Sequence, residues 1–210
     1  MLTLILLLST TADAAGPDRS RVRDLSEAYN LRRRQVRRFY AGISVAAASH
    51  GLVGAGSFRG HRYDCSGMVN AAYSRAGIDL AGRNSAAMFK LAKERNVFHR
   101  RKTPRPGDVA FFDNTHDRNN NRRLDDRLTH VAVVEKVDED GTITLIHKGG
   151  SGVTRTKMNL RRPATHKDES GKVLNSHLRY RSSRDRRRTK YLTGQLWRGF
   201  GSLWRESEAG

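Results

Sequence analysis

The chain of 210 residues contains one cysteine, Cys65. A single cysteine excludes an internal disulfide, so no covalent cross-link within the chain can stabilise the fold. An unpaired thiol is also open to oxidation once a protein leaves the cytoplasm. Cys65 is therefore either an inert core residue or a group that performs chemistry, and the residues around it must decide between the two.

Long hydrophobic runs are missing too, since the apolar run from Leu2 to Leu8 is too short to cross a membrane. Small residues follow it, and Ala12-Asp13-Ala14 has the A-x-A form of a signal-peptide cleavage site. No basic residue precedes the run, and a disordered apolar tail is the alternative. We expect a signal peptide over residues 1–14 and a protein that is secreted or lies in the periplasm or cell envelope. The lack of a cysteine near the cleavage site excludes a lipoprotein anchor.

Acidic residues are scarce, because 21 Asp and Glu stand against 40 Lys and Arg and give a net charge of +19. Such an excess does not define a fold, but it favours polyanionic partners. Nucleic acid, anionic wall or envelope polymers and anionic lipid headgroups all fit, and a solvated basic surface is the alternative. The charge is concentrated in two arginine-rich flanks, at about residues 19–38 and 179–190.

The flanks set the expected domain boundaries. We divide the sequence into a signal peptide (1–14), a basic N-terminal segment (15–35), a central domain (36–160) and a basic C-terminal extension (161–210). Apolar residues three to four positions apart predict that the extension contains a short amphipathic helix. These residues are Leu192, Leu196, Phe200, Leu203 and Trp204. We expect the protein to be a monomer.

The first half of the chain has a helical hydrophobic period. It predicts one helix from Arg19 to about His50 and a second from Cys65 to about Arg75. A third helix is expected to begin with Ser85 as its N-cap.

After about residue 108 the hydrophobic period changes from 3.6 to 2 residues. Strands are expected at Val109–Phe112, His130–Val137, Thr142–His147 and Val153–Met158. The dipeptide Asp140-Gly141 predicts a tight hairpin turn. Helices followed by a meander of strands predict an α+β fold in which N-terminal helices pack on a central antiparallel β-sheet.

Cys65 stands where the second predicted helix begins. The aligned N–H groups of a helix N-terminus favour a thiolate, Asp64 is placed to cap the helix, and Gly67 lets another backbone come close. An imidazole is needed to accept the thiol proton. His130 and His147 lie on neighbouring predicted strands that one tight turn joins, so both rings could reach one point. A cysteine, a base and a residue that orients the base are the groups of a cysteine hydrolase.

Three stretches of the sequence resemble the NlpC/P60 papain-like cell-wall peptidases. They are "DCSG" at a helix start, "PRPGDVAFFD" and "THVAVVEKVDEDGTITLIH", and the resemblance covers roughly residues 36–160. It implies a papain-like NlpC/P60 fold in which Cys65 is the nucleophile, His130 the general base and His147 the residue that orients the base. The order Cys, His, His argues against the permuted relatives that act on lipids.

The residues beside the cysteine also have counterparts in the family. Asp64 and Ser66 match positions that in some members hold the free amine of the peptide. Tyr63 is expected either in the cleft or in the core. Two features depart from the family pattern. The Tyr and Trp-Gly-Gly that often precede the cysteine are replaced by "HGLVGAGSFRG". The span between Cys65 and His130 is lengthened by an insert, "DNTHDRNNNRRLDD". The first departure leaves the substrate specificity open.

The insert contains a partial calcium-loop pattern. Asp117, Asn119, Asn121 and Asp125 fall at positions 1, 3, 5 and 9 of a loop of the EF-hand type. An arginine replaces the turn glycine, a leucine stands where the bidentate Glu belongs, and neighbouring arginines repel a dication. A structural calcium ion and a solvated Asn/Asp turn are both retained as hypotheses.

The resemblance implies an exported cysteine peptidase that needs no cofactor and hydrolyses peptide or isopeptide bonds of peptidoglycan stem peptides, of the D-γ-glutamyl-diaminopimelate type. Two alternatives stay open. One is an amidase that cuts between sugar and peptide. The other is a non-catalytic basic module that binds anionic wall polymer or nucleic acid on the same fold. Peptidoglycan is the expected partner, and for the arginine-rich flanks we prefer wall or envelope polymers over nucleic acid.

Overall fold

The computed structural model describes residues 19–121, 123, 125–181, 183 and 185–205. The signal peptide expected at residues 1–14 lies outside this range. The chain divides into two units, residues 1–37 and 38–210. Within the described range the first unit contains only the beginning of helix α1 (Arg19–His50), whose remaining residues belong to the second unit. No described helix is both long and apolar enough to cross a bilayer.

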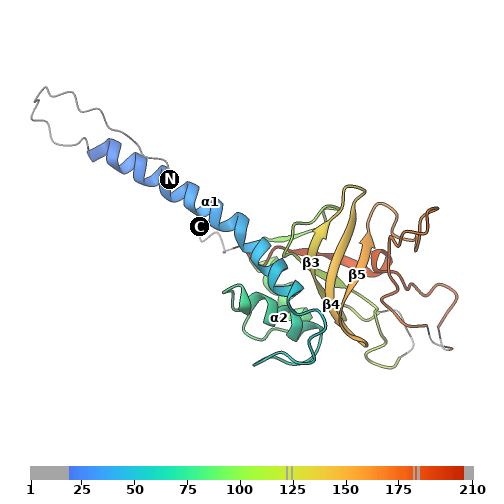
Figure 1. Ribbon diagram of the computed structural model, residues 1–210. Coiled ribbons are helices and arrows are strands. Elements are labelled where there is room, and N and C mark those ends of the chain that lie inside the picture. The colour runs from blue at the N-terminus through green and yellow to red at the C-terminus, as the bar shows by residue number, and fades with distance from the viewer. Residues whose placement is uncertain (1–18, 122, 124, 182, 184, 206–210) are drawn as a thin grey trace, which may run out of the picture. The chain divides into compact units, whose positions relative to one another are not determined.

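Six strands of the second unit form one antiparallel sheet, in the order β1-β6-β2-β3-β4-β5 (Figure 1). The strands are β1 (Phe98–His99), β2 (Val109–Phe112), β3 (His130–Val137), β4 (Thr142–Gly149), β5 (Gly152–Asn159) and β6 (Trp197–Gly201). The helices are α2 (Cys65–Arg75), α3 (Ser85–Glu94) and the one-turn α4 (Thr193–Leu196). The expected α+β class with an antiparallel sheet is confirmed.

The sheet has an apolar cluster on each face, because successive side chains of a strand point to opposite sides. On one face Met68 and Met88 of α2 and α3 pack with Val131 and Val133 of β3. On the other face the alternate β3 residues pack with the C-terminal part of the chain; this cluster contains Ala132, Val134, Leu145, Leu196 and Phe200. The sheet is therefore covered by helices on one side and by the segment after β5 on the other.

The central elements form where the hydrophobic pattern predicts them. The bounds of α2, β2 and β3 are the predicted ones. Strand β4 extends two residues further than predicted at its C-terminal end, and β5 extends one residue further at each end. The tight turn between β3 and β4 is also confirmed. Gly141 adopts a positive φ of 82°, and its N–H donates to the Asp138 carbonyl over 2.9 Å. Glycine has no Cβ to clash in this conformation.

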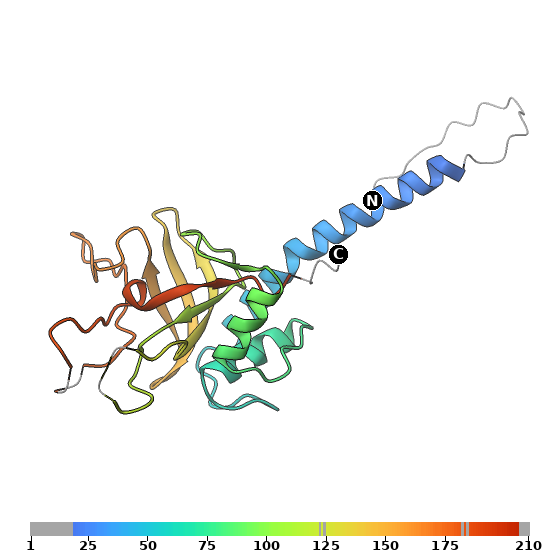
Figure 2. The same cartoon turned by 180° about the vertical axis from the view of Figure 1, so that it is seen from behind.

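The C-terminal extension was predicted wrongly. Its apolar residues do not form one amphipathic helix, because the helical turn ends at Leu196 and the chain continues as strand β6, seen in red beside β2 in Figure 2. Two glycines, Gly199 and Gly201, weaken a helix at this point. Pairing with β2 satisfies the backbone groups along that strand, and Phe200 is buried opposite Ala110. The described residues between 161 and 205 are therefore part of the same compact unit as the sheet.

The third helix begins with a different cap from the one predicted. Asn84, not Ser85, is the N-cap of α3, and its side-chain oxygen accepts from the Ala87 N–H over 2.9 Å. Ser85 instead donates its hydroxyl to the Leu128 carbonyl, which ties α3 to the segment before β3. Both residues are good caps, so tertiary contact decides which one takes the position.

Candidate active site

The residues around Cys65 form a tightly built helix start. Asp64 caps α2, and one of its carboxylate oxygens accepts from the Gly67 N–H at 2.7 Å and from the Ser66 hydroxyl at 2.8 Å. A Cβ at position 67 would lie 1.7 Å from the Arg62 carbonyl oxygen, so only glycine fits. The Asp-Cys-Ser-Gly sequence therefore fixes the backbone that carries the thiol.

The two histidines come from neighbouring strands. His130 is the first residue of β3 and His147 lies near the end of β4, and the antiparallel pairing of these strands brings their side chains together. His130 Nε2 and His147 Nδ1 are hydrogen-bonded at 2.8 Å, with the rings nearly perpendicular at 83°. The prediction that both imidazoles reach one point is confirmed.

This hydrogen bond restricts how the rings share protons. If His130 Nε2–H donates to His147 Nδ1, then neutral His130 has an unprotonated Nδ1 that can accept a proton, and neutral His147 has its proton on Nε2. His130 can then act as a base while His147 orients it. The opposite assignment would put the proton-accepting nitrogen of His130 inside the pair, where it could not serve a thiol.

Cys65 and both histidines line one pocket of about 500 Å³. The backbone N–H of Val131, which follows His130 in β3, acts on the Cys65 sulfur as a hydrogen-bond donor. The thiol therefore lies against the start of the strand that carries His130. Asp64 and Tyr63 line the same pocket. A nucleophile, a candidate base and an orienting residue thus share one cavity.

The electrostatics of the site differ from the expectation of a stabilised thiolate. Burial raises the pKa of the Cys65 thiol above its ordinary value of 9.0, and this outweighs the opposing effect of the Val131 N–H; the Asp64 carboxylate raises the pKa further. Burial also lowers the pKa of His130 to about 3, assisted by His147, and that of His147 to about 4, assisted by Lys148. A neutral thiol beside neutral imidazoles is therefore the resting form.

These shifts predict an unusual pH dependence. A histidine whose pKa is lowered binds its proton only at more acidic pH, so the base stays available well below pH 6.5. The decrease of kcat/KM on the acid side of the pH profile should therefore begin only below pH 6.5. Alkylation of Cys65 by iodoacetamide should still accelerate above pH 9, because the thiol pKa is raised. Rates measured from pH 4 to 10 check both limbs. An alkylation plateau below pH 8 would instead indicate a thiolate–imidazolium pair.

The predicted substrate-binding residues take different positions. Asp64 lines the pocket, where hydrogen bonds from Gly67 and Ser66 and the charge of Arg62 outweigh burial and lower its pKa. Tyr63 is in the cleft rather than the core, with its hydroxyl donating to the Ala55 carbonyl over 2.8 Å. Ser66 is buried and bonded to Asp64 and Arg62, and it does not line the pocket. Its contribution is to the helix start.

Several residues of the pocket were not predicted. His116 lies close enough to His130 to lower its pKa, and its Nδ1 is 3.2 Å from the hydroxyl oxygen of Thr115. His177 and Tyr180 form part of the wall and come from the segment after β5. Nothing in their local sequence marks them. His116 belongs to the insert between β2 and β3, whereas His177 and Tyr180 reach the pocket because the C-terminal segment folds back onto the sheet.

The four residues of the predicted calcium loop do not line the pocket, although Thr115 and His116 just before them do, and the side-chain oxygens of Asn119 and Asn121 bond within the loop. Asn119 Oδ1 accepts from the Asn121 N–H at 3.0 Å, and Asn121 Oδ1 accepts from the Arg123 N–H at 2.8 Å. The Asn121 amide nitrogen faces the Asp125 carboxylate at 3.2 Å. Among the described residues, no three His, Cys, Asp or Glu side chains are placed to hold a metal ion. The contacts of this loop are those of a solvated turn, and calcium stays a prediction.

Calcium binding to this loop would stabilise the folded protein by mass action. A chelator should then lower the melting temperature by a few degrees, and added calcium should restore it. Magnesium at the same concentration is the control, because it demands stricter octahedral coordination. A melting curve that is indifferent to the chelator, together with no heat in a calcium titration, would leave the solvated turn.

Comparison with protein families finds a match to the part of the chain that contains Cys65 and both histidines, but not to the whole pocket. Residues 56–149 match the model of the CHAP domain, a papain-like amidase or peptidase domain of cell-wall hydrolases. The match includes Cys65, His130 and His147, and it is to CHAP rather than to NlpC/P60. CHAP domains typically hydrolyse peptidoglycan, which supports an enzyme with peptidoglycan as its substrate. No curated protein and no solved structure matched the chain.

Proposed function

We propose that the protein is a cysteine hydrolase that cuts peptide or isopeptide bonds in the stem peptides of peptidoglycan. The observation that carries the proposal is the His130–His147 hydrogen bond in a pocket that also contains the Cys65 thiol. The match to CHAP supports the substrate. Cys65, His130 and His147 take the roles of nucleophile, general base and orienting residue.

The raised thiol pKa shapes the first step. Because the neutral thiol predominates, His130 accepts its proton as the sulfur attacks the carbonyl carbon of the scissile bond. The resulting imidazolium is stabilised by donating from Nε2 to His147 Nδ1. The negative charge on the carbonyl oxygen is held by backbone N–H groups at the start of α2, including that of Cys65.

The second half of the reaction reverses the proton transfer. Protonated His130 gives its proton to the leaving amine, and the acyl group remains on Cys65 as a thioester. Neutral His130 then removes a proton from the water that attacks the thioester. The imidazolium returns this proton to the departing Cys65 sulfur, so the carboxylic acid is released and the thiol is restored. No step needs a cofactor.

The position of the scissile bond is the finer part of the proposal. We favour the D-γ-glutamyl-diaminopimelate bond, and the CHAP match gives an amidase that separates peptide from muramic acid as the second candidate. Purified peptidoglycan is digested with the protein and with Cys65→Ala, and the released fragments are identified by mass spectrometry. A peptidase releases shortened stems, whereas an amidase releases intact stem peptides. No release by either protein would support a non-catalytic binding module.

We place the reaction in the cell envelope, with the arginine-rich flanks as contacts to anionic wall polymer. Arg186, Arg187 and Arg188 are exposed. Replacing all three with Ser should weaken sedimentation with intact walls and flatten its salt dependence, because fewer counterions are released on binding. Turnover of a small stem peptide should stay within about threefold, since charges beyond ~10 Å are screened at ~0.1 M salt.

The matched control for this prediction is the triple Lys variant, which retains the charge and should bind walls almost as the unmodified protein does. Equal loss of turnover on walls and on the small peptide would show that the cluster supports the fold or the site. If neither wall binding nor turnover of the small peptide changed, the arginine cluster would be a solvated surface.

A further inference from the structure

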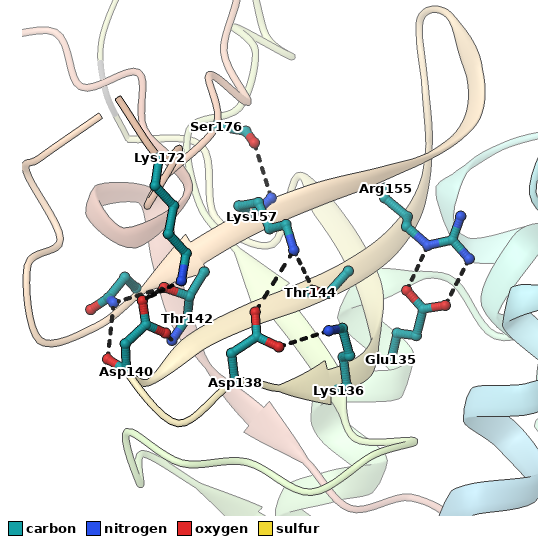
Figure 3. A network of polar contacts seen from close by, with 11 residues as sticks. Glu135, Lys136, Asp138, Asp140, Thr142, Thr144, Arg155, Lys157, Lys172 and Ser176 are labelled. Atoms are coloured by element: carbon teal, nitrogen blue, oxygen red, sulfur yellow. Dashed lines mark hydrogen bonds and ion pairs between the residues drawn. The ribbon is translucent and has the colours of Figure 1, made fainter. Parts of the chain in front are cut away.

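Basic side chains on the β3–β5 part of the sheet are matched by carboxylates (Figure 3). Arg155 makes a two-point contact with Glu135, with N–O distances of 2.7 and 2.8 Å. Single-contact ion pairs join Lys136 and Lys157 to Asp138, and Lys172 to Asp140. The cations of this surface therefore have their counter-charges within the fold.

Lys148 departs from this pattern. Its ammonium donates to the Gly149 carbonyl over 2.9 Å and lies 4.6 Å from the centre of the Tyr63 ring. Among the described residues no carboxylate lies within ion-pair distance of it, and the nearby acid Asp64 is paired with Arg62 at 3.3 Å. Lys148 is only partly exposed, so water compensates its charge incompletely.

The position of Lys148 connects this charge to the candidate site. Lys148 follows His147 in β4 and lines the same pocket as Cys65. Its charge is close enough to His147 to lower the pKa of that imidazole. The other cationic side chain that lines the pocket, Arg155, is already held by Glu135. The pocket thus contains a positioned ammonium that lacks an internal counter-charge.

We propose that Lys148 is a specificity-determining residue that binds a free carboxylate of the substrate beside the scissile bond. This rests on the proposed function and names the substrate more closely: stem peptides whose γ-linked glutamyl residue has a free α-carboxylate, in preference to those in which it is amidated. The Tyr63 ring and the Gly149 carbonyl hold the ammonium in place before substrate arrives. An amidated glutamyl residue has a neutral carboxamide at this position, which cannot form an ion pair with the Lys148 ammonium.

The test measures binding in the Cys65→Ala background, so that it does not depend on turnover. The probes are L-alanyl-γ-D-glutamyl-diaminopimelic acid and the same peptide with the glutamyl α-carboxylate converted to the amide. Calorimetry should show the free acid binding about tenfold more tightly, as expected for a charged hydrogen bond. Lys148→Met should remove this preference, and Lys148→Arg should retain most of it.

Lys172→Met is the matched control, because it removes the same charge from a lysine that pairs with Asp140 and does not line the pocket. It should leave the preference unchanged. Equal affinity for the two peptides, a preference that persists in Lys148→Met, or no binding of either peptide would overturn the proposal.

Hydrolysis of the free-acid peptide by the protein with Cys65 intact is measured separately. A Lys148-dependent binding preference without hydrolysis would keep the carboxylate site and reject the proposed enzyme. Hydrolysis of both peptides at equal efficiency, with Lys148→Met unchanged, would keep the enzyme and reject the carboxylate site.

Discussion

Cys65→Ser should lower kcat on peptidoglycan fragments by at least about 10³-fold while leaving the fold intact. The serine hydroxyl is close in size to the thiol, so the helix start capped by Asp64 should not change. A hydroxyl is far harder to deprotonate than a thiol, and neutral His130 is too weak a base to compensate without the geometry of a serine hydrolase. The acyl-enzyme would therefore form too slowly to support turnover.

Two measurements together make this prediction decisive. Fragment release reports kcat, and thermal melting of the same preparation reports folding; we expect the melting temperature to move by no more than a few degrees. The control is Ser66→Ala, which changes a neighbouring hydroxyl that does not line the pocket. Near-normal turnover by Cys65→Ser would reject Cys65 as the nucleophile.

The two histidines should differ in importance. His130→Ala should lower kcat by about 10²- to 10⁴-fold, because it removes the group that accepts and returns the proton. His147→Asn should cost much less. Asn Oδ1 is attached to Cγ as His Nδ1 is, so it can take nearly the same position and still accept from His130 Nε2–H.

His147→Leu provides the matched control, since it fills similar space without an acceptor and should fall well below His147→Asn. Steady-state rates for the three variants, each checked for folding by circular dichroism, give the order directly. If His147→Asn were inactive while His130→Ala kept most of its activity, His147 would be the general base and His130 the residue that orients it.

The catalytic geometry could be predicted from the sequence because it depends on local patterns. Asp-Cys-Ser-Gly specifies a capped helix start, and the period-2 runs around His130 and His147 specify two strands whose short turn makes them neighbours. The pairing of β3 with β4 brings the two rings into the same neighbourhood. Tertiary effects were harder to predict. The direction of the Cys65 pKa shift depends on burial by the rest of the pocket, which no local pattern reports.

The C-terminal part shows where such reasoning fails. The spacing is helical for Leu192, Leu196 and Phe200, yet only one turn of helix forms. The residues that follow it pair with the edge of β2 and form a strand instead. Since β6 joins the sheet, the polar segment before it is held against β5, and His177 and Tyr180 reach the pocket. A long-range pairing thus determines both the sheet order and one wall of the site.

The central claim is that a thioester forms on Cys65 during hydrolysis of a peptidoglycan stem peptide. The most direct test is an acid quench of the reaction in its first turnovers, followed by intact-protein mass spectrometry and peptide mapping. We predict a mass increase equal to the acyl half of the substrate, located on the tryptic peptide that contains Cys65 and absent from Cys65→Ala. Hydrolysis that proceeds in Cys65→Ala, with no adduct on the unmodified protein, would contradict the account.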